Sequence, residues 1–157
     1  MSKLHSWLSV TKAWCRLTKA PVAVVCMCRC NGESVDHLLI HCSMAGVLWN
    51  FVFRSFGIQW VLAKQVVDLL GGWWNMLGNH TSEIWNLVPL CLMWTVWREC
   101  NRRTFEDVEK SASQLLDCFA SLLFEWSCAW GFTSSTTVLH FISSLSLIPN
   151  ISYSVIP

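Results

Sequence analysis

The chain has 157 residues, the length of one domain, and a net charge of +1. Hydrophobic residues make up 54% of it, charged residues only 13%, and 11 residues are tryptophan. The small net charge excludes a global field that would attract nucleic acid, so such a role would need a local basic patch. The apolar excess indicates a piece of a larger protein or a surface that meets a partner.

The first part of the chain predicts helices on both sides of a cysteine-rich segment. Residues 1–25 carry apolar residues at helical spacing and predict a short amphipathic helix. Residues 26–42 form the cysteine-rich segment. Residues 43–56 predict a second helix, which Ser43 can cap and Gly57 ends. The apolar stripe of this helix consists of Val47, Leu48, Phe51 and Val52.

Two helices are predicted in the middle of the chain. Residues 61–77 have helical spacing, which Gly71 and Gly72 interrupt. Residues 83–105 predict a longer helix, with Pro89 placed early, where a helix tolerates it best. The apolar run in this helix is shorter than the ~20 residues that a membrane span needs, so we expect a buried core helix and no membrane partner.

The C-terminal part predicts one strong helix and one weak one. Residues 108–130 place apolar residues on one face, and Gly131 ends the helix. The Ser/Thr-rich tail over residues 133–157 contains an apolar run that predicts one weak helix. The apolar face of the strong helix consists of Leu115, Leu116, Phe119, Leu122, Leu123 and Trp126. The expected fold class is therefore mainly α, a small helical domain with a metal-clipped loop near the N-terminus.

The cysteine-rich segment contains the residue types that bind Zn²⁺ in structural sites. Cys26, Cys28 and Cys30 come first, and His37 and Cys42 follow after a turn. Thiolate sulfur and imidazole nitrogen are the usual ligands of tetrahedral zinc. His37 and Cys42 are a little over one helical turn apart, so both can face the same point. The odd number of cysteines and the lack of a signal peptide indicate a reducing compartment, where clustered thiols favour metal over disulfides.

The same residues allow a metal-free alternative. A single Cys28 or Cys30 can be a small buried hydrophobic residue instead of a ligand. We expect His41 to be an exposed or capping residue, because its neighbour Cys42 has the ligand spacing. Asp36 would orient a metal-bound histidine, as acidic neighbours of zinc ligands do.

Residues 32–42 (GESVDHLLIHC) closely resemble the zinc-binding domain at the C-terminus of plant LINE-type reverse transcriptases. That family has C-x-x-C, then Glu-Ser/Thr-Val-Asp-His-Leu-Leu, then His/Phe-Cys and a helix ending in Leu-Trp. Later segments, including residues 84–94 and 97–105, resemble its helical part. The resemblance covers about residues 25–147 and implies a zinc-binding domain over residues 25–132, after a poorly matched lead-in over 1–24.

The resemblance also implies a function. The chain would be a non-catalytic module of a retrotransposon reverse transcriptase, holding one zinc ion and helping the parent polymerase domains to bind an RNA or single-stranded DNA template. A nuclear location follows from the ancestry alone. The implied zinc ligands are Cys26, Cys28, His37 and Cys42, with Cys30 as an alternative ligand.

This chain departs from the family pattern in three ways. Val25 stands where the first family cysteine would fall, so Cys26-x-Cys28 replaces C-x-x-C. Cys100 replaces an arginine, and the basic lead-in before the cysteines is not recognisable in residues 1–24. The chain therefore resembles a truncated copy, and a metal-free structural remnant without present activity is the alternative.

The predicted long helix ends in a cluster of arginines. Arg98, Arg102 and Arg103 lie close to Trp94 and Trp97, and basic patches beside aromatic residues hold single-stranded nucleic acid. Neighbouring acids neutralise the region, and arginine at a helix C-terminus also stabilises the helix dipole, so a structural role is the alternative. We expect both tryptophans to belong to the core. The acids are Glu99, Glu106, Asp107 and Glu109.

No catalytic arrangement is recognisable. Reverse transcription requires paired aspartates that hold Mg²⁺ in a polymerase palm, and the chain has neither such a pair nor the length for a palm. A thiol redox enzyme would need C-x-x-C near a βαβ pattern. The sequence therefore predicts a binding or structural role and no enzymatic activity.

Overall fold

The computed structural model describes residues 34–73 and 82–146. These residues form six helical elements and no strand, which confirms the mainly α fold class. The predicted helix over residues 1–25 lies outside the described residues. The elements are η1 (His37–His41), α2 (Ser43–Phe56), α3 (Val66–Trp73), α4 (Ser82–Phe105), α5 (Ala112–Ala129) and α6 (Val138–Leu145).

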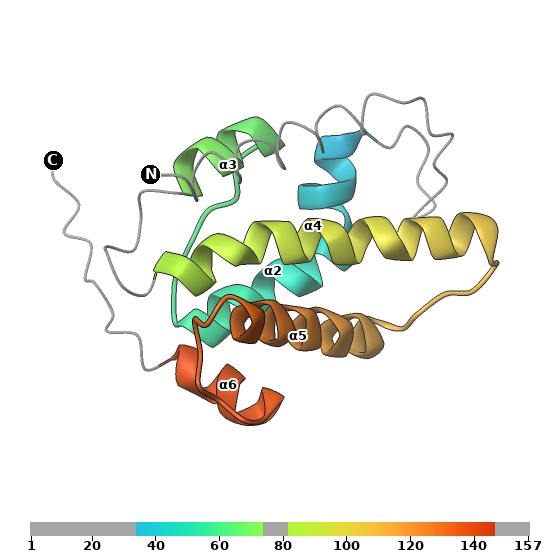
Figure 1. Cartoon of the computed structure of the whole chain (residues 1–157). Coiled ribbons are helices and arrows are strands. Elements are labelled where there is room, and N and C mark those ends of the chain that lie inside the picture. Colours follow the sequence, from blue (N-terminus) through green and yellow to red (C-terminus); the bar gives the residue numbers. More distant parts are fainter. Residues whose placement is uncertain (1–33, 74–81, 147–157) are drawn as a thin grey trace, which may run out of the picture.

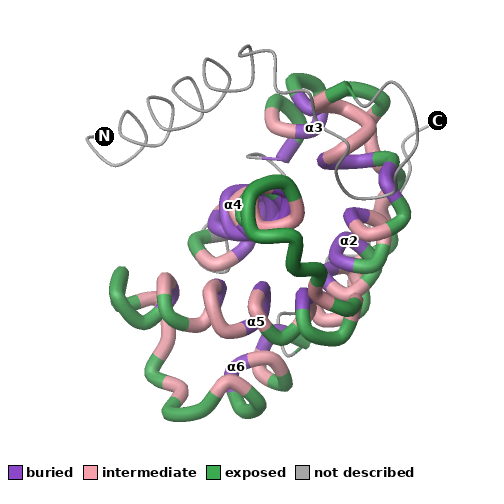
Figure 2. Tube along the Cα trace, turned by 90° about the vertical axis from the view of Figure 1, so that its right-hand side faces the viewer, coloured by how far each residue is buried: buried purple, intermediate pink, exposed green. Residues whose placement is uncertain are grey.

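The long helices α4 and α5 lie side by side, and α2 packs against both of them (Figure 1). The short helix α6 packs against α5 and α2, and η1 packs against α2 and α4. Figure 2 shows α4 nearly end-on, with α3, α2 and α5 around it and much of its surface buried. The core of the described residues is therefore centred on α4.

Helix α2 has the predicted bounds but a different N-cap residue. It begins at Ser43 and ends at Gly57, whose φ of 66° is the left-handed conformation that glycine adopts most readily. The expected cap by Ser43 is wrong. Cys42 is the N-cap residue, because its extended backbone (φ −61°, ψ 141°) separates η1 from α2, and its side chain makes no capping hydrogen bond.

The buried face of α2 is turned slightly from the predicted stripe. Leu48 and Val52 are buried as predicted, but Val47 is exposed and Phe51 is half-buried. The fully buried Trp49 replaces them, and its Nε1–H donates to the carbonyl oxygen of Leu39 at 2.8 Å. This bond between α2 and η1 holds Trp49 in the core, so the buried face of α2 differs from the one that the helical pattern alone predicts.

Two predictions for α3 are wrong. The helix begins at Val66, five residues later than expected, and it continues through Gly71 and Gly72. Its start is set by Asp36, whose Oδ1 accepts the backbone N–H of Val66 at 2.8 Å. Each glycine costs a helix about 1 kcal/mol relative to alanine, and the burial of Trp73 beyond them offsets that cost.

Helix α4 is the expected core helix, although Pro89 lies in its interior and not in its first turn. Residues on all sides of its first half are buried, which is typical of a helix in the centre of a core. No helix of the described residues is long and apolar enough to cross a membrane. The buried residues of this half include Trp85, Leu87, Val88, Leu90, Cys91 and Leu92.

Helix α5 begins at Ala112, four residues later than predicted, because Ser111 and Gln114 form a capping box at that point. It ends before Gly131 (φ 72°), as predicted. The weak helix expected in the tail is α6, and two of its residues, Phe141 and Leu145, are buried.

Candidate functional site

Two of the predicted zinc ligands lie at the two ends of one widened turn. The five residues of η1 form a π-helix, and the backbone N–H of Cys42 donates to the carbonyl oxygen of His37 at 2.6 Å. Ser34 begins the turn, because its hydroxyl oxygen accepts the N–H of His37 at 3.1 Å. Single π turns are rare and occur frequently at functional sites.

The surroundings of the two side chains differ. Cys42 is 1% exposed, belongs to the hydrophobic core and stands at the N-terminus of α2. His37 is half-buried. One thiolate and one imidazole supply half of a tetrahedral zinc site.

The other predicted ligands, Cys26, Cys28 and the alternative Cys30, lie outside the described residues. Within residues 34–73 and 82–146, no three His, Cys, Asp or Glu side chains are grouped to hold a metal ion. The described part of the chain therefore contains two predicted ligands, and the full set stays a prediction.

Two neighbours of the turn attach it to the start of α3. His41 is exposed, as expected, and its Nε2–H donates to the carbonyl oxygen of Lys64 at 3.0 Å. Asp36 accepts the N–H of Val66. We expected Asp36 to orient a metal-bound histidine, but the contact that the structure shows for it is the helix cap of α3. Both side chains therefore hold the turn against the segment that leads into α3.

The three arginines of the predicted nucleic-acid patch have different surroundings. Arg103 and Arg102 form ion pairs with Glu99 at 2.9 and 3.5 Å, and Glu99 is only 1% exposed. These two ion pairs agree with the structural alternative, in which neighbouring acids neutralise the arginines. Arg98 is exposed and forms no ion pair within the described residues.

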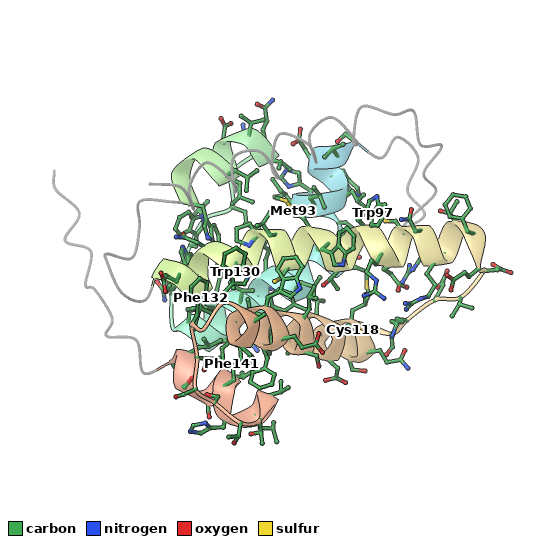
Figure 3. The ribbon with its side chains drawn as sticks, viewed as in Figure 1. Met93, Trp97, Cys118, Trp130, Phe132 and Phe141 are labelled. Atoms are coloured by element: carbon green, nitrogen blue, oxygen red, sulfur yellow. The ribbon has the colours of Figure 1, made fainter. Side chains whose placement is uncertain are left out.

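A pocket of about 100 Å³ lies between α4 and α5 beside these arginines. The sequence pattern did not reveal two of its residues, Lys110 and Cys118, whose Nζ and Sγ atoms are 3.3 Å apart. Cys118 lies on α5 (Figure 3) and Lys110 in the loop before it, so they line one cavity with α4 residues because α5 packs against α4. The pocket is lined by Trp94, Thr95, Arg98, Glu99, Arg102, Lys110, Leu115, Cys118 and Leu122.

Two tryptophans of α4 stack beside the pocket. The rings of Trp94 and Trp97 have centroids 5.0 Å apart and an interplanar angle of 26°. We expected both to belong to the core, and this is wrong for Trp97, which is 38% exposed. An aromatic surface is therefore available next to Arg98.

The chain matches no protein family, no curated protein and no solved structure.

Proposed function

We propose that this chain is a non-catalytic zinc-binding module derived from a retrotransposon reverse transcriptase, and that it helps the parent polymerase to hold a single-stranded RNA or DNA template. One observation carries the proposal. His37 and Cys42, which match the ligand positions of the resembled family, begin and end a single π turn joined by the 2.6 Å backbone bond.

The turn is suited to half of a zinc site for two reasons. Asp36 and His41 hold it against the segment that leads into α3, through the Val66 N–H and the Lys64 carbonyl oxygen. Cys42 is also the N-cap residue of α2, so the helix that follows fixes its position. Cys26 with Cys28 or Cys30 would complete the four ligands.

The nucleic-acid part of the proposal depends on the outer surface of α4. Arg98 is exposed without an acidic partner in the described residues, and the exposed Trp97 precedes it. Proteins hold single strands by phosphate contacts together with base stacking on aromatic rings. Arg102 and Arg103 contribute less to such a surface, because Glu99 neutralises part of their charge.

A gel shift of a fluorescent single-stranded RNA at physiological salt tests the two parts together. The zinc-loaded full chain should bind the RNA, a chelator should abolish binding, and added zinc should restore it. Equal binding with and without chelator would contradict a zinc-dependent module. Cys128→Ser is the matched control, because Cys128 is exposed and is not a predicted ligand.

The alternative is a metal-free helical remnant. Two observations favour it, since Cys42 is buried in the core as a small hydrophobic residue would be, and Arg102 and Arg103 are paired within the fold. A folded chain that holds no zinc and binds no RNA would support this alternative.

A further inference from the structure

We propose that the pocket between α4 and α5 binds the phosphate group of a nucleotide, with Arg98 and Lys110 as its cationic ligands. This inference rests on the proposed function and deepens it, because it names the part of the nucleic acid that the fold would hold. It is carried by the charge, size and walls of the pocket.

The charge of the pocket is positive. Three cations line it, Arg98, Arg102 and Lys110, against the single carboxylate of Glu99. Neither the Arg98 guanidinium nor the Lys110 ammonium has an acidic partner in the described residues, and the contact shown for the Lys110 ammonium is the sulfur of Cys118. Three cations against one carboxylate leave an excess of positive charge that an anionic ligand would balance.

Glu99 cancels only part of this charge, because other groups engage one of its two carboxylate oxygens. Its Oε1 accepts the Nε–H of Arg103 at 2.9 Å and the backbone N–H of Lys110 at 2.8 Å. Its Oε2 forms an ion pair with Arg102 at 3.5 Å and accepts no hydrogen bond within the described residues. The carboxylate therefore offsets the charge of Arg102 and Arg103 and holds the backbone of Lys110 beside the pocket.

The size of the pocket selects a small group. Sites for whole drug-sized ligands measure about 300–1,000 Å³, whereas this pocket has about 100 Å³. A phosphate group fits the smaller volume, with the rest of the nucleotide outside. The planar guanidinium of Arg98 suits phosphate oxygens, and lysine binds them as a point charge.

The walls point to a nucleotide and not to free phosphate. Trp94 lines the pocket and stacks on Trp97, which is 38% exposed and is not part of the pocket lining. A nucleotide with its phosphate in the pocket would bring its base toward Trp94, and stacking of a base on an aromatic ring is sequence-tolerant. The pocket and the two tryptophans would then act as a one-nucleotide clamp.

Calorimetric titration of the full chain with uridine monophosphate, uridine and inorganic phosphate tests the clamp. Uridine monophosphate should bind, and Arg98→Gln or Lys110→Met should each weaken it about tenfold or more, as expected for a lost charge-assisted hydrogen bond. Lys110→Met keeps the backbone contacts of that residue to Glu99, so the α4–α5 loop should stay folded. Arg54→Gln, an exposed arginine on α2, is the control and should bind as the unchanged chain does.

A second measurement locates the ligand. Uridine monophosphate should slow the alkylation of Cys118, which lines the pocket, and leave the exposed Cys128 unaffected. The inference is overturned by equal binding in the variants, by unprotected Cys118, or by inorganic phosphate competing as well as the nucleotide.

The gel shift with RNA separates this inference from the proposed function. Zinc-dependent RNA binding that is unchanged by Arg98→Gln, with no binding of uridine monophosphate, would overturn the clamp and leave the module standing. Binding of uridine monophosphate that needs Arg98, in a chain that does not shift RNA, would support the clamp and contradict the module.

Discussion

The indole Nε1–H of Trp73 donates a hydrogen bond of 2.9 Å to the backbone carbonyl oxygen of Trp85. In a regular helix that oxygen would accept the N–H of residue 89, but residue 89 is proline and has none. The two indole rings also stack, with centroids 4.0 Å apart and an interplanar angle of 6°. Trp73 thus supplies from α3 the donor that α4 lacks.

The first prediction concerns this bond. Trp73→Phe should leave the buried Trp85 carbonyl unpaired and cost about 1–3 kcal/mol beyond the loss of packing. In a Pro89→Ala background the same substitution should cost less, because an alanine at this position restores the N–H donor of the helix. Urea unfolding of the two single variants and the double variant measures the coupling. Strictly additive costs would show that the indole does not compensate for Pro89.

The second prediction concerns Glu99. Glu99→Gln removes the charge that pairs with Arg102 and Arg103, and breaking a buried ion pair from one side costs about 3 kcal/mol or more. Glu106→Gln is the matched control, because its contact with Arg102 is 3.8 Å long and exposed, and it should cost at most about 1 kcal/mol. Denaturant unfolding checks both values, and similar costs would contradict the structural role of Glu99.

The third prediction concerns alkaline pH. Burial raises the pKa of the Cys91 thiol far above its usual range, whereas in the unfolded chain it is about 8.5. Above pH 8.5 the unfolded chain loses this proton and the folded chain keeps it. The free energy of unfolding should therefore fall by about 1.4 kcal/mol per pH unit from this group.

Replacing Cys91 tests this effect directly. Cys91→Ala should remove that part of the pH slope, measured by denaturant unfolding between pH 7 and 10, while the exposed Cys128 replaced by serine should keep it. Identical slopes in the two variants would contradict the assignment to Cys91.

The fourth prediction concerns the start of α3. Asp36→Ala should remove the acceptor for the Val66 N–H and destabilise α3 by about 1 kcal/mol, the usual worth of a helix cap. Faster hydrogen exchange of the amides of Val66 and the following residues would confirm this. Asp117→Ala, an exposed substitution on α5, should leave those rates unchanged.

The parts of the fold that could be predicted depend on neighbours in sequence. Gly57 and Gly131 end α2 and α5 in the left-handed conformation that glycine favours. The start of α3 could not be predicted, because its cap comes from Asp36, thirty residues earlier. Likewise, α4 tolerates Pro89 because Trp73, from another element, donates to the Trp85 carbonyl oxygen that the proline leaves without a helix donor.

For the candidate site as well, one part could be predicted from the sequence and another part could not. The spacing of His37 and Cys42 predicts that both can face the same point; the structure places them at the two ends of one π turn, and a shared metal stays a prediction. The pocket could not be predicted, since Lys110 and Cys118 line the same cavity as Arg98 only because α5 packs on α4. Arg102 and Arg103 have the sequence pattern of a basic patch, but the buried position of Glu99 decides where their charge goes.

Zinc content measured by mass spectrometry on the purified full chain tests the central claim most directly. The proposal predicts about one zinc per chain, as a four-ligand structural site holds, less than about half of that in Cys42→Ser, and the full amount in Cys128→Ser. His37→Gln should lose zinc as Cys42→Ser does. A folded chain with less than about half an equivalent, or a Cys42→Ser variant that keeps its zinc, would contradict the zinc module.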